Sequence, residues 1–545
     1  MSNSETLVNR TLGKRSGNMF TARAKAFSIT AVLAVIAAVA CTDPTVAPKS
    51  TIAPGTFFGS DPNAYAEFLA KVYGGLAVGG QQGGDGSTDI QGIDGGFSQY
   101  LRLYWELEEL PTDEAVIAWG DQDLPDLNTQ TWNPGNRFST AMYYRIFFQV
   151  AMANEFLRQT TDDSLNARGV PAAKQTTIHQ YRAEARFLRA LSYWHGVDLF
   201  GNIPLVTEAQ PLGAVAPQQA TRAQVFNFIV TELQAIKSQL PMPSTQVYGR
   251  ATQAAADMLL AELYLNDSVY TGTANYAGAL AQASAVISSY GYTLASNYFA
   301  NFTATNNTSP EMIFAIPEDG VHTQTFGSTN FLIHASCGGS MNNNSYGVDG
   351  CWYGLRMKPS AHDLYAAGDT RSNAFYTAGQ TVGITSISNF NAGIPNPKYS
   401  NVGGSNPQFA DTDYPMFRLA EAYLIYAEAE VRGGGGDTTT ALSYVNALRL
   451  RAFNGDSTKM VNNSQMTLPF LLAERGRELM WEARRRTDLV RFGDFSGGNY
   501  LWAWKGKNPV GSDSIGVATA PHLDLYPLPA SELIANPNLK QNPGY

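Results

Sequence analysis

Aromatic side chains recur beside polar ones in stretches of this chain that lack helical spacing. Aromatic rings can cover the flat C–H faces of a sugar, while Asn, Gln, Asp and Arg side chains bind its hydroxyl groups. The same rings could equally pack under a loop, so the pattern leaves both roles open. The candidate ligand-contacting residues are Trp119, Trp132, Tyr346, Trp352, Tyr353, Trp502 and Trp504.

Two of the three cysteines, Cys337 and Cys351, bracket the segment that leads to Trp352 and Tyr353. An exported chain meets an oxidising compartment, so we predict a disulfide between them; the alternative is two unpaired buried thiols. A bridge would pre-organise the neighbouring aromatic side chains and lower the entropic cost of binding a ligand. We therefore prefer this segment as the ligand site.

Motifs of the common catalytic classes are absent from the sequence. It contains no H-E-x-x-H, no G-x-x-x-x-G-K-[ST], no G-x-S-x-G and no G-x-G-x-x-G, and its six histidines are scattered. Acidic pairs such as Glu108 and Glu109 are expected by chance among so many carboxylates. We predict no catalytic residues, no cofactor and a protein that is not an enzyme.

Calcium is the one metal ion that the clustered acidic residues could bind. Oxygen donors gather at residues 85–94 and 121–128, but neither group fits the calcium loop D-x-[DN]-x-[DN]-G. We interpret both as solvated acidic loops and predict no metal site.

Composition limits the partners. The chain has 545 residues, 44% hydrophobic and 15% charged, as in a packed globular protein. Its formal net charge is −9. Because an acidic surface repels phosphate backbones, we predict no nucleic-acid partner.

The N-terminus has the pattern of an export signal. Arg23 and Lys25 precede an uncharged run at 26–40, which is too short to span a bilayer as a helix. Cys41 follows directly and resembles the lipidated cysteine of a bacterial lipobox. We predict a lipoprotein signal peptide at 1–40, with translation starting at Met1 or Met19, and a flexible tether at 41–60. The alternative is cleavage that releases a soluble periplasmic protein.

The elements that must position these residues are mainly helices. Short loops join several of them into pairs, with small residues at close-contact positions, and short strands are indicated at 203–207 and 312–316. This predicts an all-α fold of tetratricopeptide-like helix pairs, with long irregular loops at 75–136, 291–411 and 493–530. The predicted helices span 64–74, 141–158, 179–200, 221–239, 252–265, 276–289, 414–432, 438–451 and 468–481.

Five groups of residues, in order, resemble the RagB/SusD family of nutrient-uptake outer-membrane lipoproteins. The likeness runs from about residue 61 to 545, and we divide it into an N-terminal region at 61–240 and a C-terminal region at 241–545 that pack as one globular unit. The groups are R-A-E-A-R-F-L-R-A at 182–190 with D-L-F-G-N-I-P-L-V-T-E at 198–208, G-R-A-T-Q-A-A-A at 249–256, F-R-L-A-E-A-Y-L-I-Y-A-E-A at 417–429, E-R-G-R-E-L at 474–479 with W-E-A-R-R at 481–485, and Y-P-L-P-A-S-E-L at 526–533.

The resemblance implies a protein anchored to the outer membrane by its lipid and facing the extracellular side. It implies binding of oligosaccharides and their delivery to a SusC-like TonB-dependent transporter. A peptide or another nutrient as cargo, or a helical scaffold that binds only proteins, stays open as an alternative. The charged residues within the motifs are interpreted as buried ion pairs between helices: Arg182, Glu184, Arg186, Arg418, Glu421, Glu474, Arg477 and Glu478.

Overall fold

The computed structural model describes residues 54–545 except 62, 85, 212, 214 and 507–514. Residues Asn63–Tyr545 form one compact unit, and Met1–Pro62 form a second unit, of which α2 (Pro54–Ser60) is described. The predicted signal peptide, Cys41 and most of the predicted tether lie outside the described residues.

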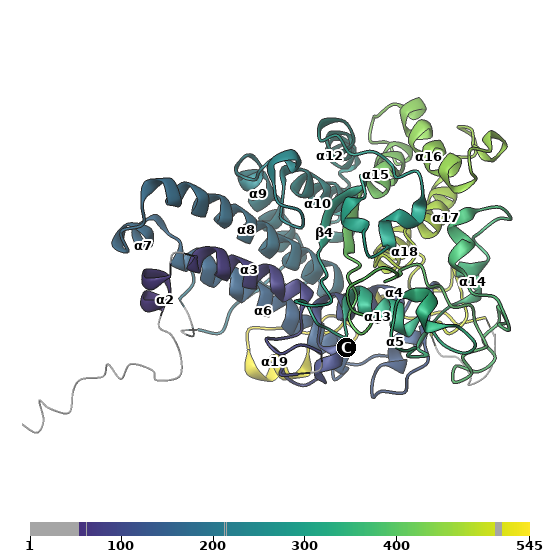
Figure 1. Ribbon diagram of the computed structural model, residues 1–545, viewed down its shortest axis with the longest axis horizontal. Helices are drawn as coiled ribbons and strands as arrows, with labels where there is room; N and C mark the ends of the chain where they lie inside the picture. Colours follow the sequence, from purple (N-terminus) through teal and green to yellow (C-terminus); the bar gives the residue numbers. More distant parts are fainter. Residues whose placement is uncertain (1–53, 62, 85, 212, 214, 507–514) are drawn as a thin grey trace, which may run out of the picture. The chain divides into compact units, whose positions relative to one another are not determined.

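Helices of the compact unit pack against one another in succession. α6 contacts α8, α8 contacts α9, α10 contacts α12, and α12, α15 and α16 follow one another (Figure 1). These helices are α6 (Arg137–Gln159), α8 (Ala172–Phe200), α9 (Arg222–Ile236), α10 (Gln253–Leu265), α12 (Tyr276–Ser289), α15 (Leu419–Val431) and α16 (Thr438–Ala452). Around them lie α3 (Ala64–Ala77), α4 (Tyr100–Glu109), α5 (Pro125–Thr129), α7 (Asp162–Ala167), α11 (Asp267–Tyr270), α13 (Ser328–Ala335), α14 (Pro359–His362), α17 (Leu468–Glu478), α18 (Arg485–Phe492) and α19 (Ala530–Ala535).

The prediction of an all-α, tetratricopeptide-like fold is confirmed. Helix accounts for 49% of the structure and strand for 6%. Several helix starts carry the polar caps that the sequence supplies: Thr221 and Gln224 form a capping box on α9, and Asn136 accepts two backbone N–H groups at the start of α6. Within the described part of the chain, no helix has the length and apolar character needed to cross a bilayer.

The predicted helix at 414–432 is wrong at its beginning. Residues Tyr414–Arg418 form strand β6, and α15 begins only at Leu419. Pro415 explains the difference, because a residue before proline is pushed into the extended conformation. β6 then pairs with β4 (Met312–Ile316).

Three two-stranded antiparallel sheets are present among the described residues. β4 pairs with β6, β2 (Ile203–Pro204) pairs with β3 (Gln219–Ala220), and β1 (Ala115–Ile117) pairs with β5 (Leu355–Met357). The last pair joins segments about 240 residues apart in the chain. It therefore ties two of the predicted irregular stretches together.

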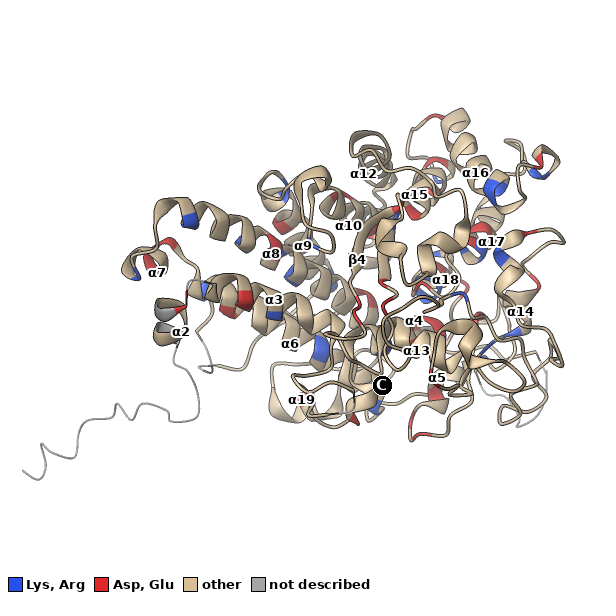
Figure 2. Ribbon diagram, in the orientation of Figure 1, with Lys and Arg blue, Asp and Glu red and all other residues tan. Residues whose placement is uncertain are grey.

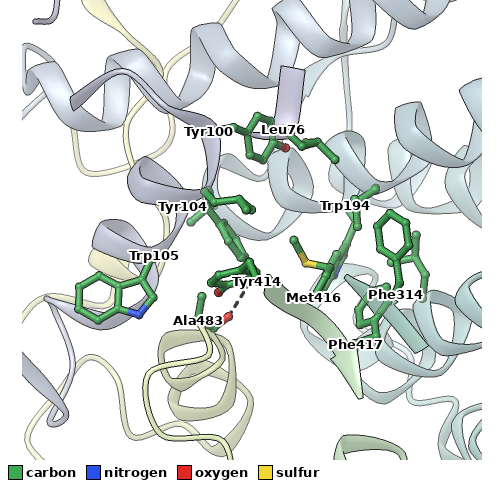
Figure 3. Packing of buried hydrophobic residues seen from close by; sticks show 14 of the residues in the cluster. Leu76, Tyr100, Tyr104, Trp105, Trp194, Phe314, Tyr414, Met416, Phe417 and Ala483 are labelled. Carbon is green, nitrogen blue, oxygen red and sulfur yellow. Dashed lines mark hydrogen bonds between the residues drawn. The ribbon is translucent and has the colours of Figure 1, made fainter. Parts of the chain in front are cut away.

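The core is centred where α4, α8 and β6 meet. Trp194 from α8 lies near Phe314 and Phe417 of the β4–β6 pair, while Tyr104 and Trp105 project from α4 (Figure 3). The Tyr104 hydroxyl donates to the carbonyl of Ala483 (3.4 Å), and the Trp105 Nε1–H donates to the carbonyl of Trp481 (3.1 Å). Helix α4 is buried all round, including its charged residues. That burial conceals the helical period, which is why the sequence pattern missed this helix.

Charged residues are frequent around α17 and α18 (Figure 2), and many of them are buried. Arg418 binds Glu478 (2.8 Å) and Glu482 (2.6 Å), and Arg371 binds Glu474 (2.8 Å). Burial alone would raise the pKa of Glu474, but the neighbouring arginines lower it to about 2. The predicted motif ion pairs are thus confirmed at these positions.

Further motif ion pairs join other helices. Arg186 donates two hydrogen bonds to the Glu232 carboxylate (2.7 and 2.9 Å). Arg250 donates from Nε to Glu184 (2.8 Å), and Arg484 forms an ion pair with Glu421. The prediction is wrong for Arg182, which donates to the carbonyl of Leu157 (2.7 Å) and to the Thr160 hydroxyl (2.8 Å). This arginine satisfies carbonyls at the end of α6, where the helix leaves them without partners.

Candidate functional site

A cavity of about 480 Å³ opens between the end of β1, the start of α4 and the segment after Cys351. It combines aromatic rings, carboxylates, an arginine and an amide. We call it the Trp119–Trp352 cavity. Its lining residues are Asp94, Gly96, Phe97, Arg102, Trp119, Asp121, Phe326, Asp349, Trp352 and Gln408.

The β1–β5 pair places Trp119. Ile117 pairs with Leu355, and the Ala118 N–H donates to the carbonyl of Gly354 (2.9 Å), so the two chains stay in register beyond the strands. Trp119 comes next, and its Nε1–H donates to the carbonyl of Trp352 (3.0 Å). Two predicted candidate residues, 233 positions apart, are therefore in direct contact.

A disulfide between Cys337 and Cys351 helps to place Trp352. It fixes the end of the segment that follows α13, and two backbone hydrogen bonds reinforce it. The Tyr353 N–H donates to the carbonyl of Cys337 (3.0 Å), and the Trp352 N–H donates to the carbonyl of His334 (2.8 Å). Because its backbone is held on both sides, little conformational entropy is lost when a ligand meets the Trp352 ring.

The two indole rings form an inclined pair. Their centroids are 6.4 Å apart and their planes meet at 48°. His334 stacks on Trp352 (4.4 Å, 21°), and Phe326 meets Trp352 edge-on (5.7 Å). One face of Trp352 is therefore covered by His334, so at most one face of the ring is left for a ligand.

Arg102 of α4 forms the polar floor of the cavity. Its Nη1 donates to the carbonyls of Gly96 (2.8 Å) and Phe326 (3.0 Å), and its Nε binds Glu106 (3.0 Å). Its Nη2 has no hydrogen-bond partner among the described residues. The guanidinium also lies over the ring of Phe97, 4.1 Å from the centroid. Burial lowers the pKa of Arg102 and raises that of Glu106 to about 7.

Carboxylates dominate the charge of the cavity, since Asp94, Asp121 and Asp349 line it together with the single cation Arg102. Burial lowers the pKa of His334, which is therefore neutral at pH 7. Its Nδ1 lies 2.8 Å from the carbonyl of Gly350, so Nδ1 carries the proton. The cavity is acidic at its rim and aromatic in its wall.

Two other predicted candidates lie near the disulfide without lining this cavity. Tyr353 is 50% exposed and meets Phe390 edge-on (5.5 Å). Tyr346 is half-buried and packs against the cluster of Cys337, Met341 and Phe390. The structure thus brings Trp352 and Trp119 together and leaves these two tyrosines outside.

The other three tryptophans that were predicted as ligand contacts are buried and have no ring face free for a ligand. Trp132 donates to the Tyr545 hydroxyl (2.8 Å) and packs on Tyr526, Trp502 lies under Lys505, and Trp504 packs with Val116 and Ile384. The sequence placed these rings in loops, but the loops are themselves folded over them, so the rings serve as local cores.

Sequence reasoning missed most of the residues that line the cavity. Arg102 lies in a helix that was not predicted, and Phe97, Phe326 and Gln408 come from separate loops. Asp94 and Asp121 were noticed, each in a different acidic group. Within the described residues, no three His, Cys, Asp or Glu side chains are grouped so that they could hold a metal ion.

Comparisons with known proteins identify the family. A family model described as "SusD family" matches residues 369–545, and one described as "Starch-binding associating with outer membrane" matches residues 102–265. The starch-binding protein SusD of Bacteroides thetaiotaomicron is 34% identical over 537 residues, which cover 88% of this chain and 91% of that protein. The chain belongs to the SusD family. The predicted RagB/SusD membership is confirmed, and so is the prediction of a binding protein that is not an enzyme.

Other proteins are similar to this chain over most of their length. SusD-like protein P2 of Formosa agariphila is 26% identical, over 96% of this chain and 100% of that protein. Surface glycan-binding protein A from Bacteroides uniformis has a TM-score of 0.68 at 23% identity, covering 88% of this chain and 99% of its own. The protein of that name from Bacteroides thetaiotaomicron, in complex with laminarihexaose, has a TM-score of 0.66 at 21% identity, with the same coverage. At these identities, the solved structures show the shared fold alone.

Proposed function

We propose that this SusD-family chain binds neutral oligosaccharides in the Trp119–Trp352 cavity. The observation that carries the proposal is the inclined pair of indole rings in a cavity that is also lined by three carboxylates and an amide. The rings can cover the C–H faces of a sugar, and Gln408 and the lining carboxylates can bind its hydroxyl groups. Two of the similar proteins are named for starch or glycan binding, which supports the same class of ligand.

The expected binding affinity suits a protein that must release its ligand. Covering one aromatic face removes about 50 Å² of apolar surface, which is worth about 1.3 kcal/mol. Two indole faces therefore supply about 3 kcal/mol, and a few hydrogen bonds bring the expected Kd into the range between about a millimolar and a micromolar.

The charges that line the cavity indicate which class of oligosaccharide it can bind. Three carboxylates face the cavity, and Arg102 is already paired with Glu106. An acidic sugar would be repelled by the rim and would meet no unpaired cation. Neutral hexose oligomers are the expected ligands, and maltohexaose is the first to test, because the relative at 34% identity is named as starch-binding.

Calorimetric titration of the folded protein tests this proposal. The ligands are maltohexaose, laminarihexaose, an oligogalacturonate and a mixed peptide library. We expect at least one neutral hexasaccharide to bind and the oligogalacturonate to bind at least tenfold more weakly. Peptide binding without any response to a glycan would contradict the proposal and favour another nutrient.

We further propose that the protein is anchored to the outer membrane through a lipid on Cys41 and delivers its ligand to a SusC-like TonB-dependent transporter. The family model described as starch-binding and associating with the outer membrane supports this location. Cys41→Ser should move the protein from the membrane fraction to the soluble fraction, with Cys337 and Cys351 left intact as the internal control. Unchanged membrane retention would contradict the anchor.

The transporter partnership has its own test. Affinity purification of the tagged protein from solubilised outer membranes should recover a TonB-dependent barrel. A preparation in which no such barrel is recovered would favour the scaffold alternative over nutrient delivery.

A further inference from the structure

A second hollow lies away from the Trp119–Trp352 cavity and shares no lining residue with it. It consists of two adjoining cavities, of about 280 and 550 Å³, that have Tyr248 and Pro317 in common. We call this site the Tyr248 hollow. Its walls come from α3, from α8 at Tyr181, from the turn before α10, and from the segments that follow β4 and precede β6.

Tyr248 presents an aromatic ring that the fold holds in place. The residue is 40% exposed, yet its hydroxyl donates to Asp413 Oδ2 at 2.7 Å. The next residue, Gly249, has φ +77°, and a Cβ there would lie 2.3 Å from Pro317 Cγ. Only glycine lets this turn close onto Pro317. The ring is therefore both accessible and pre-organised, like the rings of the first cavity.

Two more tyrosines line the smaller cavity, and both are anchored through Glu184. The Tyr73 hydroxyl donates to Glu184 (2.7 Å). Arg250 binds the same carboxylate (2.8 Å from Nε) and lies 4.9 Å from the centroid of the Tyr181 ring. Because Glu184 neutralises Arg250, this end of the hollow offers aromatic surface without a free charge.

The larger cavity offers hydrogen-bond acceptors. Glu318 is only 7% exposed, and its Oε1 has no partner among the described residues. Asp319, Asp411 and Asp413 line the same cavity, whose lining contains no lysine or arginine. These carboxylates are not grouped to hold a metal ion within the described part of the chain. Burial raises the pKa of Asp413 to about 6 and that of Glu318 well above its usual range, which also disfavours a set of permanent anions.

We propose that the Tyr248 hollow is a second carbohydrate-binding site, which holds a neutral sugar with its C–H face on Tyr248 and its hydroxyl groups on Glu318 and the neighbouring carboxylates. Fixed aromatic rings beside carboxylate oxygens, of which Glu318 Oε1 has no partner among the described residues, suit a ligand that carries both apolar faces and hydroxyl donors. The class of ligand rests on the proposed function of the first cavity. The segment after β4 links the sites, since Pro317 lines the Tyr248 hollow and Phe326 lines the first cavity.

Affinity electrophoresis in gels that contain soluble starch or laminarin tests the inference, because retardation reports weak binding to a polymer. The background is Trp119→Leu combined with Trp352→Ala, which should weaken the first cavity about a hundredfold, tenfold for each lost ring face. We expect this double variant to remain partly retarded. Adding Tyr248→Ala should abolish that residual retardation, whereas Tyr248→Phe, which keeps the ring, should preserve it.

Thermal melting of each variant confirms that it is folded, and Tyr181→Ala provides an independent second change in the same hollow. Wild-type retardation that disappears completely in the double variant would overturn the second site and leave the proposed function standing. Residual retardation that survives both Tyr248→Ala and Tyr181→Ala would also overturn it. A wild-type protein that neither gel retards would overturn both proposals.

Discussion

Trp352→Ala is the sharpest test of the Trp119–Trp352 cavity. His334 covers one face of the indole, so a ligand can use only the other. Losing one face of about 50 Å² costs about 1.3 kcal/mol, or about tenfold in Kd. We therefore expect a loss of about tenfold, and not the hundredfold loss that two free faces would give.

The neighbouring residue supplies a matched control. Tyr353 is adjacent in sequence and half-exposed, and it lies outside the cavity lining. Its φ of +57° is a conformation that asparagine tolerates, so Tyr353→Asn removes an aromatic ring with little backbone strain. Binding by this variant should stay within about twofold of wild type.

Calorimetric titration with the best hexasaccharide, paired with thermal melting, separates binding from folding. The ring of Trp352 is half-buried, so we expect its loss to lower the Tm by only a few degrees. Equal losses of affinity in Trp352→Ala and Tyr353→Asn would refute the cavity as the site. A large fall in Tm for Trp352→Ala would instead identify the ring as a core residue.

Two further predictions concern what holds the site and the fold. Replacing Cys337 and Cys351 together by alanine opens a loop of about 15 residues, which should cost about 3 kcal/mol and weaken glycan binding; urea unfolding curves identical with and without the bridge would contradict this. Glu474 should make stability pH-dependent in acid: because its pKa is lowered to about 2, its contribution of about 3 kcal/mol is complete above pH 4.5 and is lost as the pH falls toward 2. Glu474→Gln leaves Arg371 with one carboxylate partner fewer, so the variant should be less stable than wild type at pH 7. Its free energy of unfolding should also fall less than that of wild type between pH 4.5 and 2. Equal decreases in the two proteins would contradict the assignment to Glu474.

Much of the helical framework could be predicted because its apolar spacing survives in the sequence. The predicted helix at 276–289 coincides with α12, and the one at 252–265 differs from α10 by a single residue. Helix α4 could not be predicted, since arginine and glutamate occupy its buried faces together with its aromatic residues. Arg102 and Glu106 pair within the helix, whereas the partner of Glu108 is Arg486 from α18, 378 residues later.

The candidate site was predictable only in part, because long-range contacts also decide which loop aromatics are accessible. A tryptophan in a loop was treated as a candidate whether the loop was open or folded over it. Trp119 and Trp132 lie in the same predicted loop among acidic and amide residues, yet Trp132 is closed off by Tyr545 whereas Trp119 lines the cavity. Such long-range contacts leave no local pattern in the sequence.

Arg102 illustrates what distinguishes the residues that line the cavity from the buried candidates: contacts with segments far away in the sequence hold its side chain in place. Its guanidinium is held by Gly96 and Glu106 close by in sequence and by the carbonyl of Phe326, 224 positions away. The same fixing by distant segments applies to Trp119, which the β1–β5 pair carries to Trp352. We expect a loop aromatic to serve as a binding surface here when contacts with distant segments hold it in place and one face of its ring stays open. Tyr248, held by Asp413 and by the turn at Gly249, meets the same condition, and this is why the two hollows are expected to bind ligands of the same kind.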